Sequence, residues 1–345
     1  MLRLPQFEIA RPTSVSEAVT ILAEAGPAAM VVAGGTDLLP NMKHELFTPD
    51  VLVSLAGIEE LRGVREQGGG WIAIGAMTSL ADVAAHERLR ARCPALSQAA
   101  GLVAGPQLRS MGTLGGNVML DTRCQWYNQT YFWRQALDFC LKKDGTLCHV
   151  VAGGRKCVAA ASNDTAPALM TLGALLEIEG PEGRRSLPVD EFWVADGIWN
   201  KKLEPGEILV EVRIPPTPEG HRGAYGKIRD RGSIDFPLLG VAARIDFDAS
   251  GTVERADVVV TALAARPLRI QKAGASLSGA RRNSPEFDER IREVAELSHR
   301  QCHPLENIPG DAEWRREMVP VLVRRTMSAA AEGGGPSLLT PGGTI

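Results

Sequence analysis

The sequence predicts a protein of two or three domains that contain both helices and strands. The chain has 345 residues, which is too long for one small core. Apolar residues at helical spacing alternate with short apolar runs that are typical of strands. Residues 215–223 contain three prolines and two glycines and therefore resemble a linker, with a further folded unit behind it.

The first helix is the best marked of the expected elements. Ser14 and Glu17 form a capping box, apolar residues follow at helical spacing, and Gly26 lies where the helix should end. Met30–Ala33 then reads as a short buried strand. Further strands are expected at 50–55, 71–75, 174–179, 206–215, 238–247 and 253–263, and further helices at 79–84, 96–103, 287–299 and 312–327. The tail after Gly333 is expected to be mobile or bound to a partner.

Composition excludes several classes of protein. The formal net charge is -3, so the chain lacks the excess of positive charge that is typical of nucleic-acid-binding proteins. No apolar run approaches the roughly 20 residues that cross a bilayer. The first residues lack the apolar core of a signal peptide, so a cytoplasmic location is expected. Six cysteines in such a chain indicate metal or redox chemistry rather than a disulfide framework.

Two glycine turns are the first candidate site. Gly34-Gly35-Thr36-Asp37 follows the strand at 30–33, and Gly112–Asn117 follows an expected helix. Glycines let backbone amides approach a ligand closely, and successive amides form a concave anion site. Each turn alone can equally be a plain tight turn. Together they favour one extended, phosphate-bearing ligand, although the chain has neither a dinucleotide fingerprint nor a phosphate-binding P-loop.

Four cysteines form the second candidate site. Cys124, Cys140, Cys148 and Cys157 lie between the second glycine turn and Asp164, among aromatic and basic residues. The close cysteine pairs of a structural zinc site are absent, whereas cysteine spacing in iron–sulfur proteins varies widely. The residues favour a cluster over zinc, with four unrelated buried thiols as the plain alternative. No hydrolytic or nucleophilic constellation occurs, which favours an electron-transfer component.

Val31–Leu38 and Gly112–Asn117 resemble the two flavin-binding motifs of the FAD-binding medium subunits of the molybdenum hydroxylase (xanthine oxidase) family. Glu207–Val210 and the segment from Lys227 to Asp235 extend the resemblance toward the C-terminus. It implies an α+β fold, in which a two-subdomain FAD-binding unit of PCMH type precedes a smaller α+β domain similar to the C-terminal domain of CO dehydrogenase flavoproteins. The implied boundaries are 1–55, 56–215, 216–332 and a tail at 333–345.

The resemblance also implies the role of individual residues. The first motif would wrap the FAD pyrophosphate, Val103 would lie by the adenine, and Asp164 would bind ribityl or ribose hydroxyls. Leu209 and Lys227 would lie near the isoalloxazine. No catalytic residue is implied in this chain, and the implied FAD contacts are Val31, Val32, Ala33, Gly34, Gly35, Thr36, Asp37, Leu38, Val103, Thr113, Gly116, Asn117, Asp164, Leu209 and Lys227.

The segment between Asn117 and Asp164 is much longer than the short connection typical of this family. The extra residues, about 121–160, carry all four clustered cysteines and resemble the β subunit of 4-hydroxybenzoyl-CoA reductase, whose loop holds a 4Fe-4S cluster. The four cysteines would then be the cluster ligands.

This resemblance implies electron flow from a ferredoxin through the 4Fe-4S cluster and FAD. From there electrons would pass to 2Fe-2S clusters of a small subunit and a molybdopterin site in a large subunit. That site would reduce 4-hydroxybenzoyl-CoA to benzoyl-CoA, and the expected assembly is a dimer of heterotrimers.

Three other functions stay open. The chain can be the FAD subunit of an oxidising aromatic or aldehyde hydroxylase, or of a carbon monoxide dehydrogenase-type complex. It can be a zinc-stapled, non-enzymatic scaffold subunit, or a self-sufficient flavin oxidoreductase. Iron, sulfide and flavin content distinguish these classes of protein.

Overall fold

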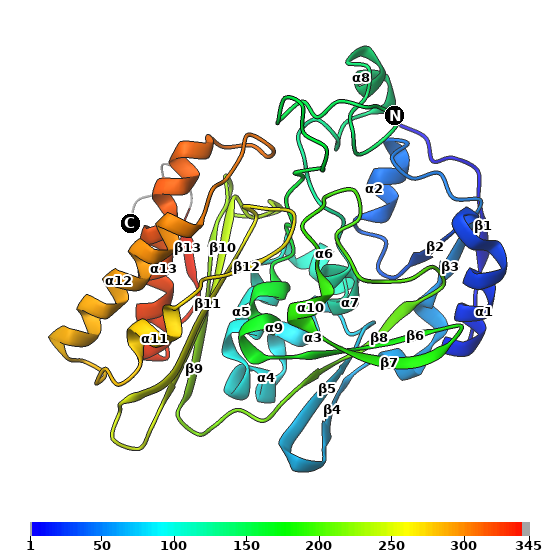
Figure 1. Cartoon of the computed structure of the whole chain (residues 1–345). Helices are drawn as coiled ribbons and strands as arrows, with labels where there is room; N and C mark the ends of the chain where they lie inside the picture. Colours follow the sequence, from blue (N-terminus) through cyan, green and yellow to red (C-terminus); the bar gives the residue numbers. More distant parts are fainter. Residues whose placement is uncertain (1, 340–345) are drawn as a thin grey trace.

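The computed structural model describes residues 2–339 and shows an α+β protein whose described strands form three sheets (Figure 1). The first sheet is parallel, in the order β1-β3-β2, and consists of β1 (Glu8–Ala10), β2 (Ala29–Val32) and β3 (Val51–Ser54). Helix α1 (Val15–Ala25) packs against it. Its capping box is confirmed, because the Ser14 hydroxyl accepts a hydrogen bond from the Glu17 amide at 3.2 Å. The Glu17 carboxylate reaches the Thr13 amide at 2.7 Å.

The second sheet is antiparallel, in the order β4-β5-β8-β6-β7. Its strands are β4 (Val64–Gln67), β5 (Trp71–Gly75), β6 (Leu175–Gly180), β7 (Gly183–Pro188) and β8 (Ile208–Ile214). A layer of mostly short helices lies between this sheet and the third sheet (Figure 1). These helices are α3 (Leu80–Ala85), α4 (Glu87–Arg92), α5 (Pro94–Leu102), α6 (Pro106–Met111), α7 (Leu114–Val118), α9 (Thr165–Leu172) and α10 (Val189–Phe192).

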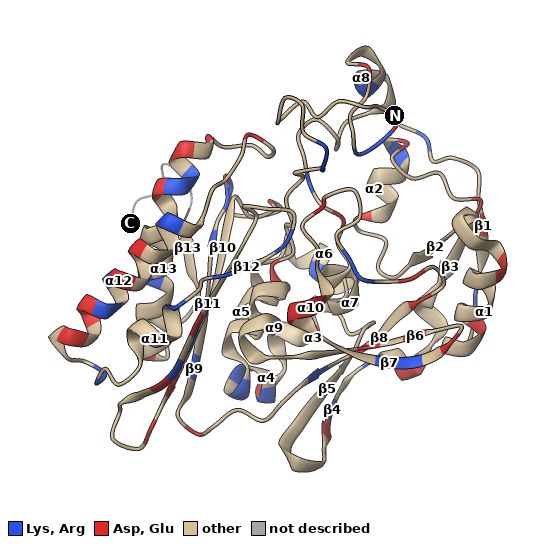
Figure 2. Cartoon of the chain, viewed as in Figure 1, with Lys and Arg blue, Asp and Glu red and all other residues tan. Residues whose placement is uncertain are grey.

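The third sheet has the order β12-β11-β10-β9-β13. Its strands are β9 (His221–Ile228), β10 (Leu239–Phe247), β11 (Val253–Thr261), β12 (Leu268–Arg269) and β13 (Ser337–Leu339). Helices α11 (Ala273–Leu277), α12 (Pro285–Gln301) and α13 (Ala312–Glu332) cover its outer face and bury a separate apolar core. Charges of both signs follow α12, as expected for a helix with one solvated face (Figure 2).

Most of the expected elements are present, with instructive differences. Residues 221–223 belong to β9 rather than to a linker, because they pair with β10. Part of the second glycine turn is helical, since α7 begins at Leu114. In the tail, residues 337–339 pair with β9 as β13, whereas 340–345 lie outside the described residues. The remaining elements are α2 (Leu38–Lys43), α8 (Tyr131–Ala136) and the 3-10 helices Gly26–Ala28, Leu55–Gly57, Glu59–Leu61 and Gly68–Gly70.

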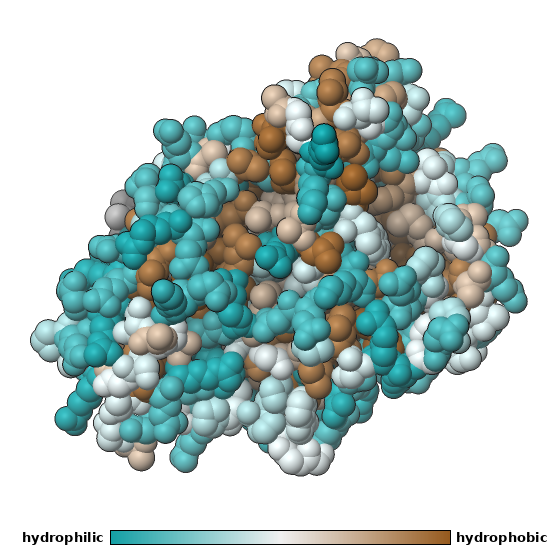
Figure 3. Space-filling view, viewed as in Figure 1, coloured by the Kyte–Doolittle hydropathy of each residue, from teal (hydrophilic) through white to brown (hydrophobic). Residues whose placement is uncertain are grey.

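Residues 121–160, hereafter the cysteine segment, project from the rest of the molecule (Figure 1). Apart from α8, the segment is irregular. Its two ends are joined, because Arg123 and Ala160 exchange backbone hydrogen bonds of 2.8 and 2.7 Å. Figure 3 shows the surface hollowed beneath the segment, with apolar side chains along the hollow. None of the helices within residues 2–339 has the length and hydropathy needed to cross a bilayer.

Candidate functional site

The two glycine turns lie against each other. A Cβ atom on Gly34 would be 1.9 Å from the carbonyl oxygen of Met111, so only glycine allows this approach. On the other side, a Cβ on Gly112 would be 3.5 Å from the Thr36 hydroxyl. Two motifs that are far apart in the sequence therefore form one continuous backbone surface, as a single extended ligand would require.

The first turn offers backbone donors. Gly35 has φ 69°, in the left-handed region that glycine adopts without strain. Among the described residues, the amides of Gly35, Thr36 and Asp37 donate to no carbonyl or side-chain oxygen. Three successive amides without an internal partner are suited to binding a phosphate group.

The second turn is held rigidly by backbone hydrogen bonds. The Gly112 carbonyl accepts from the Leu80 amide at 2.8 Å, and the Gly115 amide donates to the Ala76 carbonyl at 2.8 Å. The Thr113 hydroxyl accepts from the Gly116 amide at 3.0 Å and so caps α7. Thr113 is buried whereas Gly116 is exposed, so Gly116 is the member of this motif that is open to a ligand.

Asn117 and Asp164 are brought together, although the whole cysteine segment separates them in sequence. The Asn117 side-chain oxygen accepts from the amide and hydroxyl of Thr165, at 3.0 and 2.6 Å. Asp164 accepts from the Tyr225 hydroxyl at 2.8 Å and pairs with the Lys227 ammonium at 2.9 Å. Asn117 therefore contacts the residue that follows Asp164, and a flavin site shared by Asn117 and Asp164 stays a prediction.

The polar atoms of this group are occupied by one another. Asp164 is 2% exposed and Lys227 is 0% exposed, and Lys227 also donates to the Leu102 carbonyl at 3.1 Å. Burial raises the pKa of the Asp164 carboxyl, and the adjacent Lys227 ammonium opposes that rise. These two residues therefore form a buried connection between α9 and β9, and their direct contact with a flavin stays a prediction.

The other predicted FAD contacts lie on strand β2, at helix ends and in the core. Val31 and Val32 are on β2, Ala33 follows that strand, and Leu38 begins α2. Val103 follows α5 and is half-buried. Leu209 is 5% exposed in the core between the second and third sheets. Its position near the isoalloxazine also stays a prediction.

Arg123 and Tyr225 are polar partners at the site that the sequence did not single out. Arg123 forms an ion pair with Asp37, and Tyr225 binds Asp164. Tyr225 lies two residues before Lys227 on the same face of β9, a strand that was not predicted from the sequence. No comparable pattern marks Arg123, whose partner Asp37 is distant in sequence.

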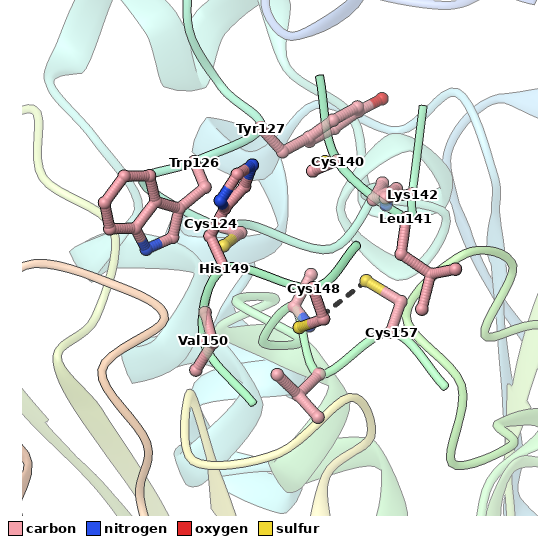
Figure 4. Close-up of a pocket in the computed structure, with 12 residues that line it drawn as sticks. Cys124, Trp126, Tyr127, Cys140, Leu141, Lys142, Cys148, His149, Val150 and Cys157 are labelled. Carbon is pink, nitrogen blue, oxygen red and sulfur yellow. Dashed lines mark hydrogen bonds between the residues drawn. The ribbon is translucent and has the colours of Figure 1, made fainter. Parts of the chain in front are cut away.

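The four predicted cysteines line one cavity of ≈ 20 Å³, together with Trp126, Tyr127 and Lys142 among others (Figure 4). Cys124, Cys140 and Cys157 are each 8% exposed. The Ala159 amide donates to the Cys157 sulfur at 3.4 Å, which is the type of contact that supports thiolate ligands. The space is small, so the side chains must move apart to admit a cluster.

The geometry does not yet define a metal centre. Within residues 2–339, no group of three His, Cys, Asp or Glu side chains lies close enough to hold a metal ion. Burial raises the pKa of the Cys124 thiol to about 12 and of the Cys157 thiol to about 11. Both are thus neutral thiols at pH 7, although the nearby Lys142 ammonium opposes part of the rise in the pKa of Cys157. The predicted cluster loop is not shown by this arrangement and stays a prediction.

Known families match nearly the whole chain. Residues 5–217 match the FAD binding domain in molybdopterin dehydrogenase, and residues 224–330 match the CO dehydrogenase flavoprotein C-terminal domain. The first match alone covers more than half of the sequence, so the fold is that of a flavoprotein subunit. The chain belongs to the FAD-binding medium subunits of the molybdenum hydroxylase family.

Individual relatives agree with this assignment. The carbon monoxide dehydrogenase medium chain of Hydrogenophaga pseudoflava is 31% identical over 326 residues, which cover 94% of this chain and 97% of the relative. The aldehyde oxidoreductase FAD-binding subunit PaoB of Escherichia coli is 37% identical over 281 residues, covering 79% and 86%. A solved structure of carbon monoxide dehydrogenase from Hydrogenophaga pseudoflava matches with TM-score 0.78 and 31% identity, covering 96% of this chain and 99% of that chain.

Proposed function

We propose that this chain binds one FAD across the two glycine turns and carries electrons within a molybdenum-containing oxidoreductase. The observation that carries the proposal is the contact between the two turns, with Gly34 against the Met111 carbonyl. The amides of Gly35, Thr36 and Asp37 would bind the FAD diphosphate, and Thr113, which caps α7, would fix the second turn. Bound FAD supplies chemistry that exchanges one or two electrons.

The relatives support one class of complex better than another. Their names are carbon monoxide dehydrogenase medium chain and aldehyde oxidoreductase FAD-binding subunit, and they do not indicate a 4-hydroxybenzoyl-CoA reductase. We therefore place the chain in an oxidising complex of the carbon monoxide dehydrogenase or aldehyde oxidoreductase type. The expectation of a reductase, taken from the long cysteine segment, becomes the second candidate.

The proposed partners are a molybdopterin-binding large subunit and a 2Fe-2S small subunit, in a dimer of heterotrimers. Substrate would bind to the large subunit, so this chain would accept or deliver electrons only. Co-expression with neighbouring reading frames, and purification through a tag on this chain, tests the assembly. A purified complex that contains molybdenum supports it, whereas a chain that purifies alone with full flavin oxidoreductase activity supports a self-sufficient enzyme.

Gly34→Ala tests the flavin site directly. The added methyl cannot fit beside the Met111 carbonyl, so the turns must separate, and FAD content should fall at least tenfold. Gly68→Ala is the matched control, because a Cβ there meets nothing within 4 Å. Flavin absorbance per chain measures both. If Gly34→Ala retains its FAD, the two turns are not the binding site.

The second candidate function rests on the four cysteines around one cavity. Cys124, Cys140, Cys148 and Cys157 would hold a 4Fe-4S cluster, which would exchange electrons with a ferredoxin-like protein. Three of the thiols are buried among aromatic side chains, and the Ala159 amide already donates to Cys157. If the cluster is present, the competing function of the complex is the reduction of 4-hydroxybenzoyl-CoA.

Metal analysis decides between the cluster and its alternatives. We expect about four irons and matching sulfide per chain, lost in Cys140→Ser and retained in Cys302→Ala, which alters a buried cysteine outside the segment. Zinc without iron would support the scaffold alternative. Iron content that is unchanged in Cys140→Ser would remove Cys140 from the ligand set.

A further inference from the structure

Arg123 connects the cysteine segment to the first glycine turn. Its guanidinium forms an ion pair with the Asp37 carboxylate and lies 3.5 Å from the side-chain oxygen of Asn41. Asn41 in turn donates to the second Asp37 oxygen at 3.1 Å. The side chains of Arg123 and Asp37 are only 14% and 28% exposed. The partly buried carboxylate of the turn is therefore paired with a residue that adjoins Cys124.

Besides its ion pair with Asp37, two further contacts fix the position of Arg123. Its backbone pairs with Ala160 at the base of the segment, and the ring of Phe236 lies 4.2 Å from the guanidinium carbon. Burial lowers the pKa of Arg123 to about 10, so the group is still charged at neutral pH. A fixed positive charge thus faces the turn, contributed by the cysteine segment and covered by Phe236 in the loop between β9 and β10.

Arg123 offsets a negative charge at the turn that is proposed to bind a diphosphate. The amides of Gly35, Thr36 and Asp37 are placed to bind a diphosphate, yet Asp37 brings a carboxylate to the same turn. An unpaired carboxylate in a partly buried site repels an anionic ligand strongly, because the screening by water is weak there. Arg123 cancels that charge. In addition, α2 begins at Leu38, and the Asp37 side chain caps none of its amides, because its oxygens are used by Arg123 and Asn41.

We propose that Arg123 is a positioning residue that couples the cysteine segment to FAD binding by neutralising Asp37. The inference rests on the proposed function, in which the two turns bind the FAD diphosphate. It deepens that function, since it makes flavin affinity depend on the segment that carries the cysteines. Arg123 touches no reacting atom and acts through Asp37.

A double-mutant cycle on the full-length chain tests the coupling, with FAD binding to the apoprotein followed by flavin fluorescence. Arg123→Gln leaves Asp37 unpaired and should weaken FAD binding at least tenfold. Asp37→Asn removes the repelling charge, so the double variant should bind within about threefold of Asp37→Asn alone. Arg123→Lys keeps the charge and should recover most of the affinity, whereas Arg123→Met should not.

The outcomes are distinguishable. If the double variant binds as weakly as Arg123→Gln, Arg123 acts by folding the segment and the charge mechanism is wrong. If Arg123→Gln binds FAD like the unaltered chain, no coupling exists. If the unaltered chain itself fails to bind FAD, the proposed function fails with it. A charge-independent structural role would make Lys and Met equivalent at position 123, which also overturns the proposal.

Discussion

The glycine turns and the cysteine segment are built in opposite ways. The turns are held by contacts between backbone atoms. Gly34 packs against the Met111 carbonyl, and Gly112 and Gly115 form backbone hydrogen bonds with neighbouring segments. In the cysteine segment, long side chains hold irregular backbone in place. Arg134 donates to the carbonyls of His44 and Glu45, and Lys142 donates to Asp121 and the Gly197 carbonyl.

The two regions differ in how much each would have to rearrange to bind a ligand. A site of backbone amides fixed by neighbouring hydrogen bonds needs no rearrangement to receive a phosphate. A site of thiols must lose protons and adopt a metal's geometry, so metal binding and local folding are coupled. The backbone of the two turns is already in contact in the structure, whereas, within residues 2–339, the cysteine segment brings its side chains to one cavity without the spacing of a metal centre.

The largest expected effect lies where the third sheet contacts the start of α9, a few residues after the cysteine segment. Lys227→Met leaves the Asp164 carboxylate buried without its cation, and should lower the free energy of unfolding by about 3–5 kcal/mol. Tyr225→Phe removes one hydrogen bond to the same carboxylate and should cost about 1–2 kcal/mol. Urea unfolding measures both. Equal costs would mean that Lys227 contributes only as a hydrogen-bond donor.

A smaller, local effect is expected within the cysteine segment. The Lys142 ammonium is buried and lies 2.7 Å from both Asp121 and the Gly197 carbonyl. Lys142→Met should destabilise the segment by about 2–4 kcal/mol, because the Asp121 carboxylate loses its cation. The Gly197 carbonyl keeps its hydrogen bond from the Thr122 hydroxyl. Hydrogen exchange should then accelerate across residues 121–160.

The glycine turns provide the comparison for this experiment. In the second turn, the amides of Gly112, Leu114 and Gly115 should exchange as before, since backbone hydrogen bonds hold them. Lys143→Met is the control, because Lys143 is half-exposed and its ion pair with Asp144 is 3.5 Å long. If exchange also accelerates at residues 112–116, the two regions are not independently held.

The smallest expected effect is a pH dependence in the second sheet. Hydrogen bonds from Arg185 lower the pKa of the Glu207 carboxyl below its value in the unfolded chain. The pair therefore stabilises the fold above the unfolded pKa of about 4.3, and this contribution disappears as the pH falls through the folded pKa. Arg185→Gln should cost about 1 kcal/mol or less at pH 7, because Arg185 is partly exposed.

The test is the slope of stability against pH. Arg185→Gln and Glu207→Gln should both flatten the acid limb below about pH 5, and their curves should nearly coincide there. A limb as steep in both variants as in the unaltered chain would show that other carboxylates dominate acid unfolding.

The sequence predicted what depends on local pattern. The capping box at Ser14, the strands β10 and β11, and the first glycine turn all follow from residue type and spacing. Helix α7 was missed because Gly115 and Gly116 disfavour helix, although Thr113 is a good N-cap. The start of β9 was hidden among prolines and glycines, and pairing with β10 overrides that composition.

What depended on distant contacts could not be predicted. The Met111 carbonyl beside Gly34 and the Arg123 pair with Asp37 arise only once the chain has folded. The gathering of the four cysteines was expected from their density, but density carries no information on sulfur positions. Side-chain geometry at that cavity depends on the packing of Trp126, His149 and Lys142, which no spacing rule specifies.

The paired ends of the cysteine segment have an evolutionary consequence. Arg123 and Ala160 are hydrogen-bonded neighbours, so the residues between them leave and re-enter the fold at one point. The entropy of closing a loop grows only slowly with its length, and a long excursion from such a point is tolerated almost as well as a short one. The segment can therefore be gained, lost or exchanged for a hairpin turn between members of the family while the flavin scaffold keeps its topology.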